Sequence, residues 1–248
     1  MTKVDRIAAA LAEAHGNPPA LVPANELAAL SRDRAYEIQS KVLALLGQPA
    51  SVIKVAIGAD GLSLGAPIPA GLVFANGEHI AHKRPLEGIE IEVAVRLAED
   101  LTPEIAKRGR GAVLQVIDSF LFGIELISSR IDNRNEAGPF GPLADFMVTG
   151  GYVIGDQALP EEPAAPGLPI VVRCNGEVIS NGVAAYPFED ALTPIIAFAS
   201  SRQPGSERLR KGIIITTGAL NGLISLPEHG GITVSVGSYE AASFRLRT

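Results

Sequence analysis

Tryptophan is absent from this chain of 248 residues, aromatic residues make up only 5% of it, and cysteine occurs once. The single cysteine, Cys174, excludes an internal disulfide and a metal site built from several thiolates. Hydrophobic residues still make up 47% of the chain. The sequence therefore predicts a substantial core composed mainly of Ala, Val, Ile and Leu.

An excess of positive charge is also missing, because 27 acidic residues outnumber 21 basic ones and give a net charge of −6. This balance argues against a nucleic-acid-binding surface, which requires concentrated Lys and Arg. No apolar run approaches the roughly 20 residues needed to cross a bilayer, and the first residues lack the pattern of a secretory signal. We therefore expect a cytoplasmic protein with neither a nucleic-acid nor a membrane partner.

The first 50 residues differ in pattern from the rest of the chain. Within residues 4–11 and 35–45, apolar side chains recur at helical spacing, and glycine follows each run. His15 is expected on the surface of the first helix. The sequence predicts two parts: an N-terminal helical segment, 1–50, packed on a β-rich main domain, 51–248.

From residue 51 onward, short β-branched runs separated by Gly and Pro predict strands. The expected strands are 51–57, 88–97, 123–130, 150–154, 170–173, 212–216, 232–236 and 242–246. Hairpin turns are expected at Asn76-Gly77 and Asn175-Gly176, and short helices at 102–108 and 191–201. Because regular strand–helix alternation and a glycine-rich phosphate motif are both missing, the predicted class is α+β with a curled mixed sheet, without a nucleotide cofactor.

Residues 88–97 alternate strictly, so Glu90, Glu92 and Arg96 share one face of the predicted strand. Two carboxylates at this spacing repel each other unless a positive group lies between them. Carboxylate oxygens are hard ligands that suit Mg²⁺, Mn²⁺ or Ca²⁺. The alternative interpretation is a solvated strand face on which Arg96 partly compensates the two acids.

Glu125 is an isolated charge in the apolar run 120–127. A buried carboxylate must be paired, hydrogen-bonded, protonated or bound to a metal. Pairing with Arg130 is the simpler alternative. Together with Glu90 and Glu92, however, Glu125 favours a site made of three carboxylates.

Lys54 is likewise the only charge in the apolar run 51–57. A buried ammonium group suits proton transfer or the binding of an anion. The alternative is a lysine at the edge of the sheet whose charged end extends into water.

The order of these motifs along nearly the full chain resembles the 2-keto-4-pentenoate hydratase family, which includes the 4-oxalocrotonate decarboxylases and belongs to the fumarylacetoacetate hydrolase-like superfamily. The matching segments are Ala35-Tyr36-Glu37-Ile38-Gln39, Lys54, Glu90-Ile91-Glu92, Glu125, Ser129-Arg130-Ile131, Ala144-Asp145, Tyr152-Val153-Ile154-Gly155 and Thr217-Gly218-Ala219-Leu220. The resemblance implies an N-terminal helical segment followed by a β-rich mixed-sheet roll of the fumarylacetoacetate hydrolase-like type.

The resemblance also implies roles for individual residues. Glu90, Glu92 and Glu125 would bind a divalent metal, Mg²⁺ or Mn²⁺. Lys54 would be catalytic, and the substrate would be bound by Arg130, Asp145, Thr217 and Gly218. The implied enzyme is a homo-oligomeric lyase of aromatic meta-cleavage catabolism that adds water to a 2-hydroxy-2,4-dienoate or 2-oxo-enoate, giving a 4-hydroxy-2-oxo acid.

The chain departs from the family pattern in several places, of which two bear on the chemistry. Asn76 replaces an acid thought to assist proton transfer, and Glu189-Asp190-Ala191 replaces a Gly-His-Pro segment. Three alternatives therefore stay open: a decarboxylase of the 4-oxalocrotonate type, a hydrolase of C–C bonds in acylpyruvates, and a weakly active or non-catalytic subunit in complex with a pathway enzyme.

Overall fold

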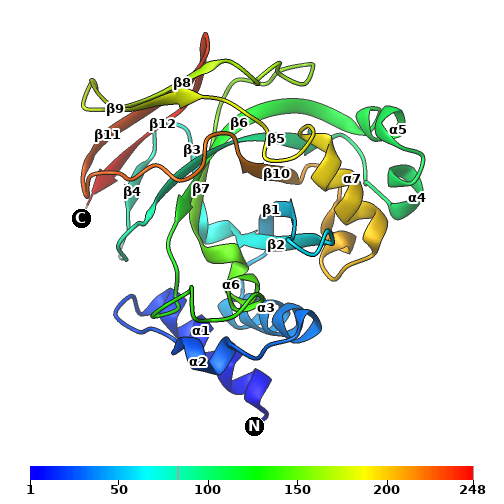
Figure 1. Ribbon diagram of the computed structural model, residues 1–248, viewed down its shortest axis with the longest axis vertical. Coiled ribbons are helices and arrows are strands. Elements are labelled where there is room, and N and C mark those ends of the chain that lie inside the picture. The colour runs from blue at the N-terminus through cyan, green and yellow to red at the C-terminus, as the bar shows by residue number, and fades with distance from the viewer. Residues whose placement is uncertain (83, 248) are drawn as a thin grey trace.

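The computed structural model describes residues 1–82 and 84–247. Two curved β-sheets face each other at one end of the molecule, and the N-terminal helices gather at the opposite end (Figure 1). A second group of helices covers one side of the larger sheet. This arrangement confirms the predicted α+β class.

The N-terminal helices are α1 (Lys3–Gly16), α2 (Ala24–Leu27) and α3 (Arg32–Leu46). Thr2 caps α1 and Ser31 caps α3, while Gly47 ends α3 in the left-handed conformation with a φ of 63°. Their apolar sides share one core with α6 (Gly141–Ala144) and the flanking residues. In the described part of the chain, no helix is long and apolar enough to span a membrane.

This shared core has two consequences for the sequence predictions. The division into residues 1–50 and 51–248 stays a prediction. Residues 131–146, which belong to the second part, pack within the hydrophobic core of the N-terminal helices. The prediction that His15 lies on the surface was wrong. His15 is half-buried, and its ring lies 5.4 Å from that of Phe146, centroid to centroid, because the later segment covers this side of α1.

The larger sheet has the strand order β2-β1-β10-β5-β6-β7-β3. Its strands are β1 (Ala50–Ile57), β2 (Ser63–Pro69), β3 (Val73–Ala75), β5 (Gly88–Leu97), β6 (Ile117–Ile127), β7 (Thr149–Ile154) and β10 (Ile214–Ala219). The pairs β1–β10 and β3–β7 are parallel and the others antiparallel, so the sheet is mixed as predicted.

The smaller sheet has the strand order β4-β12-β11-β8-β9. Its strands are β4 (His79–Ala81), β8 (Pro169–Cys174), β9 (Glu177–Val183), β11 (Gly230–Val236) and β12 (Tyr239–Arg247). The main hydrophobic core lies between the two sheets, where Val93 and Phe122 belong to the same cluster as Val234 and Phe244. The opposite face of β5 and β6 is therefore free to carry polar groups.

The remaining helices complete the fold. They are α4 (Pro103–Ala106), α5 (Arg110–Leu114), α7 (Leu192–Ser201), η1 (Ala70–Leu72), η2 (Phe146–Val148) and η3 (Ser206–Arg208). Helix α7 packs against β1, β2 and β10. The helices expected at 102–108 and 191–201 are thus confirmed as α4 and α7.

Each expected strand has a counterpart in the structure, but two predictions need correction. The strand expected at 123–130 begins earlier and ends at Ile127, and the Asn76-Gly77 turn does not form a hairpin. Strands β3 and β4 on either side of that turn enter different sheets, so the turn joins the two sheets. The hairpin at Asn175-Gly176 is confirmed, because β8 and β9 pair directly across it.

Candidate metal centre

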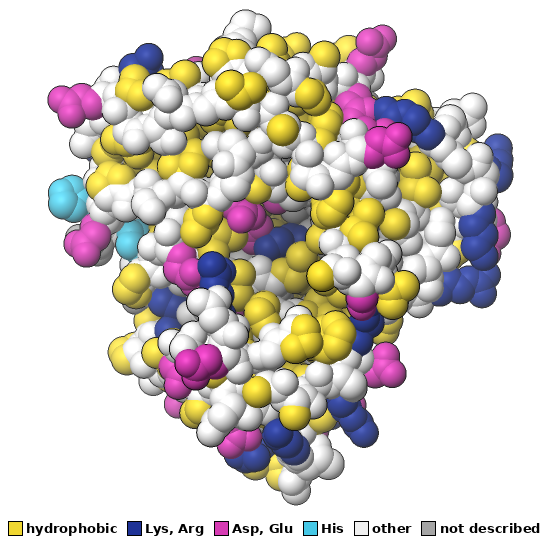
Figure 2. Space-filling view, viewed as in Figure 1, with side chains coloured by type: hydrophobic (Ala, Val, Ile, Leu, Met, Phe, Trp, Pro, Cys, Tyr) yellow, Lys and Arg dark blue, Asp and Glu magenta, His cyan; other side chains and the backbone are white. Residues whose placement is uncertain are grey.

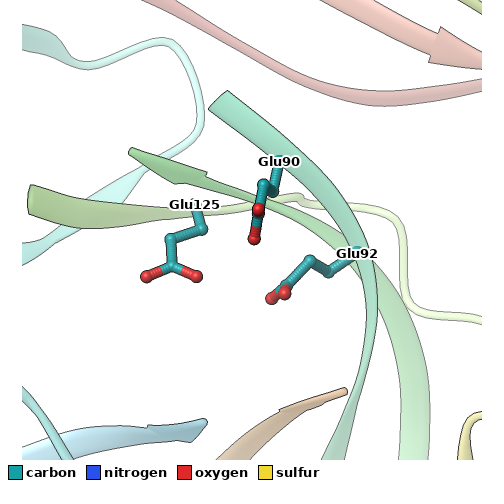
Figure 3. Close-up of side chains that lie close together, drawn as sticks. All are labelled: Glu90, Glu92 and Glu125. Carbon is teal, nitrogen blue, oxygen red and sulfur yellow. The ribbon is translucent and has the colours of Figure 1, made fainter. Parts of the chain in front are cut away.

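Three glutamates converge on the concave face of the larger sheet. In the antiparallel register of β5 and β6, Glu90 lies opposite Glu125 and Glu92 lies opposite Gly123. One carboxylate oxygen of each glutamate lies within 4.8 Å of those of the other two (Figure 3). Glu92 and Glu125 are buried, whereas Glu90 is partly exposed.

Lys54 joins this cluster from the neighbouring part of the sheet. Its Nζ donates to Glu125 Oε1 at 2.6 Å and to the Met147 carbonyl at 2.8 Å, and the residue is only 6% exposed. The lysine is therefore inside the protein, and the alternative of a solvated edge residue is wrong. Figure 2 shows a hollow in this face of the molecule in which both acidic and basic side chains are visible.

The Met147 carbonyl is presented by an unusual turn. Phe146, Met147 and Val148 have φ values of 51°, 53° and 58°, a left-handed conformation that L-residues rarely adopt. Such strain persists only where surrounding contacts stabilise it and is concentrated at functional sites. Here the turn places a backbone acceptor beside Lys54 and so fixes the direction of its ammonium group.

A chain of hydroxyl groups approaches Glu92 from the other side. The Tyr152 hydroxyl donates to Thr216 Oγ1 at 3.1 Å, and the Thr216 hydroxyl donates to Glu92 Oε2. Gly123 is required here, since a Cβ at this position would lie 2.1 Å from the Tyr152 hydroxyl oxygen. Burial raises the pKa of Tyr152 well above its usual range, so the phenol keeps its proton and acts as a donor.

The electrostatics of the cluster favour a cation. Burial, together with repulsion from Glu125, raises the pKa of Glu92 to about 8, and burial also raises the pKa of Glu125 against the opposing effect of Lys54. Glu125 Oε2 is buried and has no hydrogen-bond partner among residues 1–82 and 84–247. A buried acceptor without a partner is rare in proteins. A divalent ion bound by all three carboxylates would both partner this oxygen and relieve the repulsion, so Glu90, Glu92 and Glu125 fit a metal with hard oxygen ligands.

The predicted substrate-binding residues occupy different surroundings. Arg130 and Asp145 form a buried pair, with Arg130 Nε donating to Asp145 Oδ1 at 2.6 Å. The Thr217 hydroxyl donates to the Val93 carbonyl at 2.8 Å, and Gly218 adopts a φ of 98° beside Pro187. The structure thus brings Lys54 and the three glutamates together, while the substrate roles of Arg130, Asp145, Thr217 and Gly218 stay predictions.

Asn76 has a structural place in the fold. Its Oδ1 accepts from the Ser243 backbone N–H at 2.6 Å, and its Nδ2 donates to Asp156 Oδ2 at 2.8 Å. These bonds join the β3–β4 connection to β12 and to the segment after β7. An amide is suited to this position because it donates on one side and accepts on the other.

No protein-family model matches the chain. Among solved structures, 4-oxalocrotonate decarboxylase from Pseudomonas putida G7 complexed with magnesium and adipate is similar over 100% of this chain and 99% of that chain, with a TM-score of 0.81 and 20% sequence identity. The same protein complexed with calcium and acetate gives a TM-score of 0.80 at 20% identity, with the same shares of both chains covered. Fumarylacetoacetate hydrolase from Exiguobacterium antarcticum is similar over 81% of this chain and 76% of that chain, with a TM-score of 0.53 and 17% identity. The chain therefore has the fumarylacetoacetate hydrolase-like fold that its motifs predicted, in the arrangement seen in 4-oxalocrotonate decarboxylase.

Proposed function

We propose that this protein is a metal-dependent enzyme that acts on a small 2-oxo or 2-hydroxy-dienoic acid and adds water to it, giving a 4-hydroxy-2-oxo acid. The observation that carries the proposal is the convergence of Glu90, Glu92 and Glu125 beside the buried Lys54. The full-length similarity to an enzyme complexed with magnesium and adipate, a dicarboxylate, supports a metal-dependent enzyme for a small organic acid.

The three glutamates would hold Mg²⁺ or Mn²⁺. When bound, such a cation supplies a Lewis acid that stabilises the negative charge developing on the C2 oxygen of a 2-oxo acid during enolisation. The carboxylates themselves are held by the paired backbones of β5 and β6, so their positions change little when a substrate enters.

Lys54 would bind the carboxylate of the substrate or transfer a proton. An ammonium group has three N–H donors, of which two are directed at Glu125 and Met147. The third is available for the carboxylate of a substrate or for transfer of a proton to or from its carbon chain. Since Lys54 is buried, its attraction for a bound anion is weakly screened by solvent.

Decarboxylation of a longer dicarboxylate is the second candidate, and two observations favour it. The similarity to 4-oxalocrotonate decarboxylase extends over the whole chain. Asn76, at the position of the missing family acid, is engaged in structural hydrogen bonds. Loss of CO₂ requires stabilisation of the resulting enolate and a proton donor, but no base to activate water.

A substrate panel tests both candidates. The purified protein would be assayed with Mg²⁺ or Mn²⁺ against 2-hydroxypenta-2,4-dienoate, a six-carbon 2-oxo-enedioate and an acylpyruvate, with products identified by mass. We expect turnover of the first substrate to a 4-hydroxy-2-oxo acid, whereas CO₂ release from the second would favour the decarboxylase. Turnover of the acylpyruvate alone would show a C–C hydrolase. No turnover of any substrate by the metal-loaded protein would favour a non-catalytic partner subunit.

A further inference from the structure

Each of the two buried glutamates of the centre has one oxygen already engaged by a protein donor. The Thr216 hydroxyl binds Glu92 Oε2, and the Lys54 ammonium binds Glu125 Oε1. Glu125 Oε2 is left without a hydrogen-bond partner in the described part of the chain. Each of these carboxylates thus has one oxygen engaged by the protein, which leaves the other oxygen for a metal.

The direction of the hydrogen bond between Thr216 and Glu92 is defined. A hydroxyl group has a single proton, and Thr216 uses it for Glu92 while its own oxygen accepts from Tyr152. Both donors are buried, with Tyr152 fully inaccessible to solvent. The Tyr152 ring lies over Gly123, where any side chain would clash with it.

The two donors are also fixed relative to each other. Lys54 and Thr216 are register partners in the parallel pair β1–β10, and their acceptors lie on the paired strands β5 and β6. Rotation of either carboxylate toward a metal would break a buried hydrogen bond, which is costly in an apolar interior. The arrangement therefore resists the binding of an ion through both oxygens of Glu92.

We propose that Thr216, supported by Tyr152, is a positioning residue that limits Glu92 to one metal-facing oxygen and thereby makes the centre select Mg²⁺ over Ca²⁺. Ca²⁺ accepts about 6–8 oxygen ligands and commonly takes both oxygens of a carboxylate, whereas Mg²⁺ requires a compact octahedral shell of about six. Two buried carboxylates that each contribute one oxygen, together with Glu90, suit the smaller ion. This inference rests on the metal site of the proposed function and adds the residue that determines its selectivity.

The test is a calorimetric titration of the metal-free protein with Mg²⁺ and, separately, with Ca²⁺. Thr216→Val removes the hydroxyl and nearly preserves the shape. We expect its preference for Mg²⁺ over Ca²⁺ to fall by about tenfold, the lower end of the loss in metal affinity that follows removal of a bond that orients a ligand. Thr216→Ser retains the hydroxyl and should keep the wild-type preference. Tyr152→Phe, which removes only the support of Thr216, should produce a smaller fall in the same direction.

Thr217→Val is the matched control. It makes the same substitution at the adjacent buried threonine, whose hydroxyl donates to the Val93 carbonyl and not to a carboxylate. Its preference should equal that of the wild type. An equal fall in Thr217→Val and Thr216→Val would assign the effect to general disturbance of β10 and overturn the inference.

The outcomes separate this inference from the proposed function. If the wild type binds Mg²⁺ and folded Thr216→Val keeps the same preference, the inference is wrong and the metal site stands. If the wild type binds neither cation, both are wrong. Should Thr216→Val fail to fold, as judged by circular dichroism, an unchanged preference in Tyr152→Phe would overturn the inference.

Discussion

Glu90 and Glu125 face each other directly across β5 and β6, so that two acids occupy one cross-strand pair. Like charges in such a pair destabilise a sheet, and here the third acid, Glu92, lies on the same face. The sheet tolerates this arrangement because Lys54 compensates part of the charge.

Glu90→Gln should affect stability and metal binding in opposite directions. In the presence of a chelator, loss of repulsion should raise the free energy of unfolding by up to about 1 kcal/mol, as measured by urea denaturation. Mg²⁺ affinity, measured by calorimetry, should fall because one ligand loses its charge. Glu99→Gln, an exposed acid just beyond β5, is the control and should change neither quantity. A Glu90→Gln protein that binds Mg²⁺ like the wild type would contradict the three-carboxylate site.

Raising the pH should destabilise the metal-free protein between about pH 6.5 and pH 8, above the range in which His15 has the opposite effect. Burial raises the pKa of Glu92 from 4.5 to about 8, so in this range the folded state holds a proton that the unfolded state has released. This contribution is present in full below the unfolded pKa and is lost as the pH rises through the folded one. Urea denaturation across the range should show the decline in wild type and a flatter profile in Glu92→Gln. Saturating Mg²⁺ should also flatten it, and an unchanged slope in Glu92→Gln would contradict the assignment.

Lowering the pH should destabilise the protein through His15. Burial, with the nearby Arg130 and Arg84 guanidinium groups, lowers the pKa of His15 from 6.5 to about 2. The unfolded state therefore gains a proton first, and stability falls as the pH drops below about 6.5. Thermal unfolding should show less acid sensitivity in His15→Asn than in wild type. His79→Asn, at an exposed histidine, should retain the wild-type profile.

Lys54→Met should reduce turnover by at least about 100-fold, the lower range expected for loss of a proton-transfer group. Mg²⁺ binding should persist, because the metal-facing oxygens remain. Lys107→Met, at an exposed lysine, is the matched control. Comparable turnover in Lys54→Met and Lys107→Met would exclude a catalytic role for Lys54.

Asn76→Asp should lower stability without improving turnover. The substitution replaces the amide donor that bonds to Asp156 with a second carboxylate, and a loss of about 1 kcal/mol is expected for this bond. Combining it with Asp156→Asn restores a donor and an acceptor and should recover the melting temperature. A large gain in turnover in Asn76→Asp alone would instead indicate that this position once carried the catalytic acid.

The sequence was sufficient to predict the strand 88–97 and hence the shared face of Glu90 and Glu92, because strict alternation defines both the strand and its sides. Glu125 and Lys54 could be predicted because each is a lone charge in an apolar run. The residues that converge in the candidate centre could thus be named from local pattern, while their role as metal ligands was predicted from the family resemblance.

The groups that orient those ligands were missed for a physical reason. Thr216 and Tyr152 are ordinary strand residues, and their roles depend on β10 and β7 lying near β5 and β6, which no local pattern encodes. The Met147 turn was missed because its left-handed conformation lacks glycine. Strand β2 was missed because Gly65, Pro67 and Pro69 obscure its strand pattern. Proline is tolerated in β2 because this strand lies at the edge of the sheet.

The position of β10 between β1 and β5 determines when the centre can form during protein synthesis. Lys54 belongs to the first strand made, whereas β10 is among the last, so most of the chain must leave the ribosome before the two can pair. Until then the glutamates lack the Thr216 donor, and β1 has no neighbour linking it to β5. Such distant pairing is slow compared with local folding. The glutamates of β5 and β6 can therefore come together before Lys54 and Thr216 reach them, and the complete centre is expected to assemble late in folding.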